Sequence, residues 1–201
     1  LRSARSNRNY WLLNIGFFVC GFHVAFIATH FPAYLADNGL PTMEAATALS
    51  MIGLFNIFGS TTFGYLGDRY RKKYLLAGLY FGLAIVITLF LLVPVTRVSS
   101  LLFGAAIGYL WLATVPLTSG MVAQIFGARY LATLYGIVFF SHQIGAFLGV
   151  WLGGRVYDVS GTYLPVWLLA IGLGVLAGLI HLPISDTRRP LPQPLAATEP
   201  T

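Results

Sequence analysis

The chain alternates between long apolar stretches and short polar segments, and its charged residues mark the boundaries. Charge-free intervals lie between charged residues 8 and 37, 44 and 68, 73 and 97, 97 and 129, 129 and 155, and 158 and 186. Each interval is long enough for the ~20 residues with which a helix crosses ~30 Å of hydrocarbon. The pattern predicts six transmembrane helices, at approximately 10–36, 45–66, 74–95, 100–126, 130–156 and 163–182.

The apolar residues within an interval run continuously, as in LLAGLYFGLAIVITLFLLV from Leu75 to Val93. A lipid-facing barrel strand would alternate apolar and polar positions, whereas a helix bonds its own backbone groups. We therefore expect an all-α integral membrane bundle at 10–182. Residues 1–9 are interpreted as the end of a cytoplasmic linker. The proline-rich segment 183–201 has no apolar period and is predicted to be a disordered cytoplasmic tail.

Polar residues divide the predicted helices into two kinds. The third and sixth are nearly pure Leu, Ile, Val, Ala and Gly, whereas the first, second, fourth and fifth carry Asn, Gln, Ser, Thr or His. Polar groups are costly in lipid, so the polar-bearing helices should face protein or a watery cavity and the apolar two should face lipid. This order of two polar-bearing helices and one apolar helix occurs twice. Because each unit has an odd number of helices, the second unit enters the membrane from the opposite side. The pattern therefore indicates two inverted three-helix repeats, as in many secondary transporters.

Composition and charge agree with a membrane protein. Of the 201 residues, 57% are hydrophobic and 9% are charged, whereas a soluble domain is about one quarter charged. The net charge of +6 does not indicate nucleic-acid binding, because the basic residues flank apolar runs instead of forming a patch. If successive segments between the helices lie on alternate sides of the membrane, one side receives all 12 Lys and Arg residues except Arg97 and Arg155. The positive-inside rule then puts both ends in the cytoplasm, in an inner or plasma membrane.

Two features of the helices concern packing. Gly145, Gly149 and Gly153 recur every fourth residue of the fifth predicted helix and should allow close approach of a neighbouring helix. Pro32 and Pro116 are each able to interrupt a helix. Pro116 is the better candidate for a break that lines a cavity, because Thr114 and Thr118 lie beside it.

A loop rich in basic residues joins the second and third predicted helices. It consists of a small-residue helix exit, one acid and several cations, which we interpret as a conformational latch: Gly64, Gly67, Asp68, Arg69, Arg71, Lys72 and Lys73. Positive-inside anchoring is the alternative interpretation, but it leaves Asp68 unexplained. Asp68 is able to pair with Arg69 or Arg71 in a contact that forms or breaks as helices rock.

This loop resembles the G-x-x-x-D-R-x-G-R/K-R/K signature of the major facilitator superfamily, with Arg71 in place of the later glycine. The stretches Asn56–Ser60 and His142–Gly145, and Tyr157-Asp158 further on, are similar to its oxalate/formate antiporter and monocarboxylate transporter branch. The resemblance extends to about Leu182. It implies that the chain is the C-terminal six-helix half of a twelve-helix fold, which holds its solute between the two halves.

The chain departs from this branch at two positions. The branch often carries a cation where Ser60 stands, and some members carry Asp where Asn56 stands. Neither anion pairing nor proton coupling is therefore transferred to these positions.

No predicted helix contains an acid, Lys or Arg in its interior, so a protonatable relay must use His23, His30 or His142. Histidine suits this role because its unperturbed pKa is ~6.5. Hydrogen bonding that holds helices together is an equally favoured role for all three. His181, near the cytoplasmic interface, is expected to be inert. The candidate substrate or coupling residues are His23, His30, Asn56, Thr118, His142 and Gln143.

We expect a secondary active transporter, a symporter or antiporter, that moves a small organic solute by alternating access. A carboxylate is the favoured solute class and protons are the candidate coupling ion. The expected partners are lipid and the N-terminal half, since the chain begins at Leu1 and not at Met. No enzyme activity, metal or cofactor is expected, because the predicted helices lack clustered ligands. A self-dimerising half-transporter and a non-transporting receptor remain alternatives.

Overall fold

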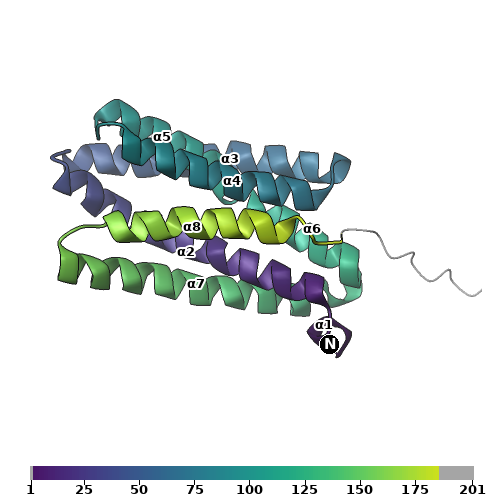
Figure 1. Ribbon diagram of the computed structural model, residues 1–201. Coiled ribbons are helices and arrows are strands. Elements are labelled where there is room, and N and C mark those ends of the chain that lie inside the picture. The colour runs from purple at the N-terminus through teal and green to yellow at the C-terminus, as the bar shows by residue number, and fades with distance from the viewer. Residues whose placement is uncertain (1, 186–201) are drawn as a thin grey trace, which may run out of the picture.

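The computed structural model describes residues 2–185, and every regular element in that range is helical. Six helical segments are long and apolar enough to span a membrane, which confirms the predicted number. The elements, shown in Figure 1, are α1 Arg2–Arg5, α2 Arg8–Asp37, α3 Thr42–Arg69, α4 Lys72–Leu92, α5 Arg97–Trp111, α6 Thr114–Phe126, the 3-10 turn η1 Ala128–Tyr130, α7 Leu131–Ser160 and α8 Leu164–His181.

The fourth span consists of two helices, where the sequence predicts one at 100–126. Helix α5 ends at Trp111 and α6 begins at Thr114. Pro116 lacks the N–H that a continuous helix would bond to the Leu112 carbonyl, and this carbonyl accepts from the Val115 N–H at 3.0 Å instead. Helix α2 continues through Pro32 without interruption. The prediction that Pro116 is the helix-breaking proline is confirmed.

The helices pack as two inverted repeats. Helices α2, α3 and α4 form one unit, and the α5–α6 pair, α7 and α8 form the other. The most extensive contacts join α2 to α7, α3 to α5, and α4 to α8. The first helix of each unit therefore packs against the second helix of the other unit, and the two third helices pack against each other. This reciprocal arrangement is the one that a two-fold relation between inverted units requires.

Glycine backbones make the two reciprocal contacts close. On α7, Gly145 faces the Phe18 carbonyl of α2, and a Cβ at Gly149 would lie 2.5 Å from the carbonyl oxygen of Phe22. Between α3 and α5, a Cβ at Gly104 would lie 2.6 Å from the carbonyl oxygen of Ala48. No side chain fits at these positions unless the two helices separate.

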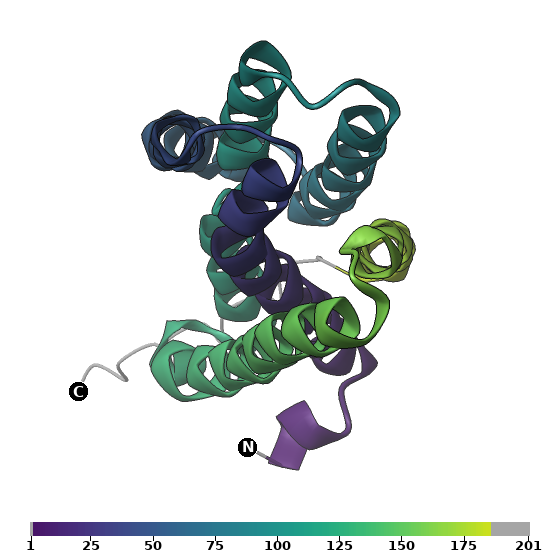
Figure 2. The same cartoon turned by 90° about the vertical axis from the view of Figure 1, so that its left-hand side faces the viewer.

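The two sides of the bundle differ. Helices α3 and α7 lie on one side with α2 and α6 between them, and α4 and α8 lie on the other (Figure 2). We call the first side the α3–α7 face. Only 17% of the most apolar stretch of α3 and 22% of that of α7 is buried, compared with 61% for α2. Within the described chain, the most exposed spans are thus two polar-bearing helices. The two apolar helices, α4 and α8, expose large aliphatic side chains such as Ile85, Leu89 and Leu168.

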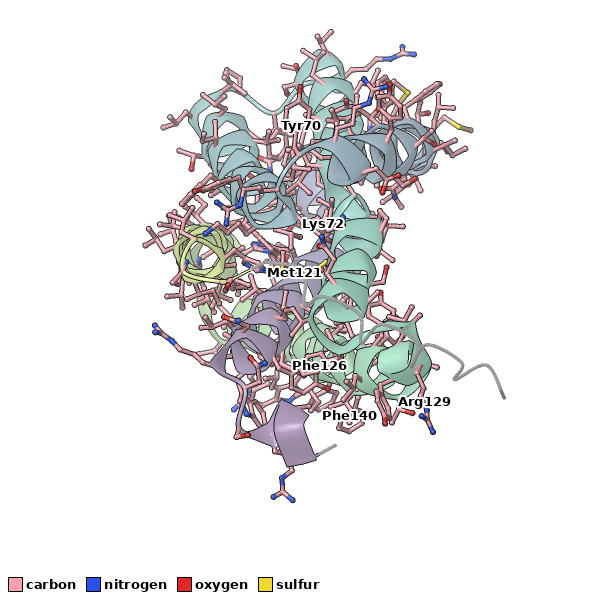
Figure 3. The ribbon with its side chains drawn as sticks, turned by 90° about the vertical axis from the view of Figure 1, so that its right-hand side faces the viewer. Tyr70, Lys72, Met121, Phe126, Arg129 and Phe140 are labelled. Atoms are coloured by element: carbon pink, nitrogen blue, oxygen red, sulfur yellow. The ribbon has the colours of Figure 1, made fainter. Side chains whose placement is uncertain are left out.

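Charges gather at the ends of the bundle. Arg8, Arg69, Lys72 and Arg129 lie at the end that faces the viewer in Figure 3, which we call the basic end. Arg97 lies at the opposite end and forms an ion pair with Glu44 at 3.5 Å. Of the predicted tail, residues 186–201 lie outside the described residues. Ile184 is buried, and the Ser185 N–H donates to Asn9 Oδ1 at 3.2 Å.

The α2–α7 contact provides a test of this packing. We expect Gly145→Val to lower the free energy of unfolding by about 3 kcal/mol, because its side chain would overlap the Phe18 carbonyl. Gly136→Val on the same helix is the matched control, since a Cβ there has no neighbour within 4 Å. Thermal unfolding in detergent measures both. Equal losses of stability in the two variants would contradict the assigned contact.

Candidate functional site

The break in the fourth span is held by a side chain from the second span. The Leu112 N–H donates to Oδ1 of Asn56 on α3 at 3.2 Å, so the side chain satisfies a backbone donor that the break leaves without a helical partner. The Thr114 hydroxyl donates to the Trp111 carbonyl at 3.1 Å and lies 3.2 Å from the Cys20 sulfur of α2. Helices α2 and α3 thus both contact the break.

Three of the six buried side-chain polar atoms that have no hydrogen bond among the described residues lie on this span: Trp111 Nε1, Thr118 Oγ1 and Gln124 Oε1. The other three belong to His23, Tyr135 and Trp167. Thr118 is only 1% exposed. A buried polar group without a partner costs roughly 1–3 kcal/mol, so these atoms favour a bound water or solute. Of the predicted site residues, Thr118 and Asn56 therefore belong to the surroundings of the break.

His23 and His30 both bind backbone carbonyls of neighbouring helices. His23 is fully buried and its Nε2 lies 2.8 Å from the Ala170 carbonyl oxygen of α8, while Nδ1 has no partner. The Nε2 atom of His30 lies 2.9 Å from the Val150 carbonyl oxygen of α7. The two residues share the sequence spacing of one helix face, but they connect α2 to different helices. This geometry matches the hydrogen-bonding alternative for both.

The His142 side chain has different contacts from those of the other two histidines. Its ring stacks on Phe139 at 5.4 Å and contacts the ring of Phe17 of α2 at 4.9 Å. Its Nδ1 lies 3.1 Å from Oε1 of Gln143, which is exposed. The three histidines that the sequence groups as one relay thus have separate surroundings. His142 is the one whose side-chain hydrogen bond is to another side chain.

The predicted latch loop is held to the ends of α3, α6 and α8. Lys72 Nζ donates to the Gly67 carbonyl at 2.5 Å, and its stem lies against Gly120 of α6. Figure 3 shows Lys72 between the α3–α4 turn and α6. Lys73 Nζ donates to the Leu182 carbonyl at 3.1 Å. This turn therefore connects elements from both repeats at the basic end.

The acid and the two arginines of the loop have different surroundings. Asp68 is exposed and makes no ion pair within residues 2–185. Arg69 lies over the Tyr65 ring at 4.3 Å, and Arg71 lies over the Tyr74 ring at 5.4 Å. The predicted pairing of Asp68 with an arginine of its own loop does not occur in this conformation.

His181 is a buried residue, where the sequence suggests an inert interfacial one. It is 1% exposed, and its Nδ1 lies 2.7 Å from the Ala177 carbonyl oxygen. Its ring stacks on Tyr80 at 5.0 Å and faces Gly16. The Tyr80 hydroxyl donates to the Gly16 carbonyl at 2.7 Å. The one feature of the sequence that could have indicated this contact is Gly16, whose small size leaves room in α2 for the rings of Tyr80 and His181.

Within residues 2–185, no group of three His, Cys, Asp or Glu side chains lies close enough together to hold a metal ion. The polar groups around the break are amides, hydroxyls and an indole. Such groups bind a solute by hydrogen bonds.

The sequence profile of the Major Facilitator Superfamily matches residues 13–200. The chain belongs to this superfamily. It is 26% identical over 195 residues to an uncharacterized MFS-type transporter, YcxA, of Bacillus subtilis, covering 92% of this chain and 46% of that protein. It is 28% identical over 174 residues to mouse monocarboxylate transporter 12, covering 83% of this chain and 36% of that protein.

Monocarboxylate transporter 12 of Xenopus laevis is 32% identical over 161 residues, covering 74% of this chain and 34% of that protein. The chain therefore spans less than half the length of these relatives. Its family consists of membrane transporters, and the six apolar helices make it a multi-pass membrane protein.

The Asn56 contact predicts a measurable loss. Asn56→Leu should lower the free energy of unfolding by about 1 kcal/mol and speed amide hydrogen exchange at Leu112, because that N–H loses its acceptor. Ser50→Leu is the matched control on α3, since the Ser50 hydroxyl bonds only Ala46 of its own helix. Exchange at Leu112 that stays at the wild-type rate in Asn56→Leu would exclude the capping role.

Proposed function

We propose that the chain is one half of a secondary active transporter whose solute passes along the α3–α7 face. The observation that carries the proposal is the placement of the broken fourth span. Its α6 segment lies beside α2 on this face, and the two least buried spans of the described chain flank it. Interrupted helices at a repeat interface are where transporters commonly bind solutes and ions.

A second six-helix half is the proposed cover of this face. The relatives are more than twice as long as the part that this chain matches. The polarity of α3 and α7 supports the same arrangement, since both carry polar residues and yet expose more of their surface than α4 and α8. Rocking of the two halves would then expose the break to each side of the membrane in turn.

We propose a small organic carboxylate as the solute. The mouse and Xenopus relatives are both named monocarboxylate transporters, and this likeness supports the proposed solute class. The described spans have no cation in their interiors, so this half would bind the carboxylate through neutral donors. The Asn56 amide, the Thr118 hydroxyl and the Trp111 indole N–H are candidate donors around the break, and Gln143 is an exposed amide on α7. A compensating positive charge would come from the other half.

We propose that His142 is the proton-coupling group of this half and that His23 and His30 hold helices together. His23 and His30 each engage a backbone carbonyl of a neighbouring helix, so protonation changes would strain the packing of α2. His142 bonds only the flexible Gln143 side chain. We also propose that the basic end faces the cytoplasm, because eight of the ten Lys and Arg residues within 2–185 flank the spans on that side.

Transport by reconstituted protein tests the proposed function. We expect proteoliposomes to accumulate radiolabelled short-chain monocarboxylates when an inward proton gradient or an outward carboxylate gradient is imposed. Asn56→Leu should lower the initial rate, whereas the Ser50→Leu control should retain it. The absence of solute accumulation under every imposed gradient, with correctly folded protein, would refute the transporter proposal. A purified species whose mass equals two copies of this chain would favour the self-dimerising alternative.

Histidine substitutions separate coupling from packing. Uptake should rise as the outside pH falls from ~7.5 to ~5.5, across the ~6.5 pKa of an ordinary imidazole. His142→Gln should flatten this profile. His23→Gln should instead lower the thermal unfolding midpoint and leave the shape of the pH profile intact, because it removes the bond to Ala170. An unchanged profile in His142→Gln would remove His142 from the coupling mechanism.

A further inference from the structure

An apolar groove runs between α4 and α5 at the opposite end of the bundle, beneath the loop that joins them. Its volume is about 490 Å³. It lies away from the break and from every predicted site residue. The lining side chains are Val86, Leu89, Phe90, Val93, Pro94, Thr96, Val98, Ser99, Leu102, Phe103 and Ala106.

A second groove continues from the first. It has a volume of about 350 Å³ and lies between α4 and α8, with Ile85, Thr88, Ile171 and Val175 among its lining residues. Leu89 lines both grooves, so they meet on the outer surface of α4. From Pro94 to Phe81 the path follows α4 for roughly 20 Å at 1.5 Å per residue. This length is comparable with one leaflet of the ~30 Å hydrocarbon core.

The polar groups of the α4–α5 groove lie at the end of the bundle opposite the basic end. In the α4–α5 groove the only hydroxyls belong to Thr96 and Ser99, and both lie in the cap of α5. Arg97 lies between them in sequence and its side chain is 71% exposed. Its Nε atom lies 3.5 Å from Oε2 of Glu44 on α3. The path is thus mostly apolar, and the exposed cation Arg97 stands in the chain between the lining residues Thr96 and Val98 at one end of it.

We propose that this path binds one phospholipid of the leaflet at the opposite end. The guanidinium of Arg97 binds the phosphate, one acyl chain lies in the α4–α5 groove, and the second crosses Leu89 into the α4–α8 groove. Charge complementarity at the mouth and the two connected grooves match a head group with two chains. Both grooves are lined by α4, which lies with α8 on the side away from the α3–α7 face (Figure 2).

The lining suits an acyl chain, because its hydroxyls bond within their own segments: Thr88 donates to the Ala84 carbonyl and Ser99 donates to the Pro94 carbonyl. A helix with its side chains is 10–12 Å across. An extended acyl chain is much thinner and has no polar backbone to satisfy. The proposal does not depend on the transport activity, because it concerns the outer surface of the bundle.

Photochemical labelling of the purified protein tests the proposal. The probes are phosphatidylglycerol and phosphatidylcholine, each with a diazirine in one acyl chain, at trace level in phosphatidylcholine vesicles. We expect adducts to concentrate at Leu89, Leu102 and Ala106, with the phosphatidylglycerol probe preferred. Arg97→Gln should reduce that preference about fivefold, since one basic residue near the surface favours an anionic lipid by about this factor. Ala106→Phe should abolish labelling of the α4–α5 groove.

Control variants distinguish the grooves from lipid that merely surrounds the protein. Leu168→Phe on α8 enlarges an exposed side chain outside both grooves and should leave the labelling unchanged. Val175→Trp should remove adducts from the α4–α8 groove only. If Ala106→Phe does not fold, Leu102→Trp replaces it. Labelling that follows exposure alone along α4, α5 and α8, or that persists in the groove-filling variants, would overturn the proposal.

Discussion

Hydrocarbon offers no partner to a peptide group, so each N–H and C=O within a span must be bonded by the chain itself. Five of the six spans in the described chain meet this condition through an unbroken or nearly unbroken helix. The fourth does not, since Pro116 lacks one donor and the turn at residues 112–113 leaves others unbonded. Asn56 supplies the acceptor for Leu112 from a different helix. The contact with α3 therefore stabilises a break that Pro116 introduces.

The same solvent also decides how the helices meet. Burial of side chains yields little free energy when the surroundings are as apolar as the side chains, so close backbone contact and hydrogen bonds hold the bundle. Glycines allow α7 to approach α2 and α5 to approach α3. His23 and His30 then join α2 to α8 and α7 through backbone carbonyls. Helix α2 is the most buried span because it contacts helices of both repeats.

The sequence predicts the number of spans, the inverted repeats and the helix-breaking role of Pro116, because charge, polarity and proline act locally. It does not reveal which neighbour a polar side chain will meet. His23 and His30 share a spacing of seven residues, and yet their partners are on different helices. Gly104 and Gly108 have the same four-residue spacing as Gly145 and Gly149, but the spacing does not say that their neighbour is α3. The burial of His181 depends on Gly16 and Tyr80, which are distant in sequence, and the contacts of Lys72 with Gly120 likewise require the assembled bundle.

The broken span has a mechanical consequence for the paired repeats. Their contacts are related by symmetry, but their stiffness is not. The first span of one unit is a single 30-residue helix, whereas its counterpart consists of 15-residue and 13-residue helices that meet at a two-residue joint. Bending at that joint disturbs the bond from the Val115 N–H to the Leu112 carbonyl, whereas bending α2 would disturb several consecutive helical bonds. When the two units move against each other, the α5–α6 span should therefore bend before α2 does. The unpartnered polar atoms of the fourth span lie along this more flexible span.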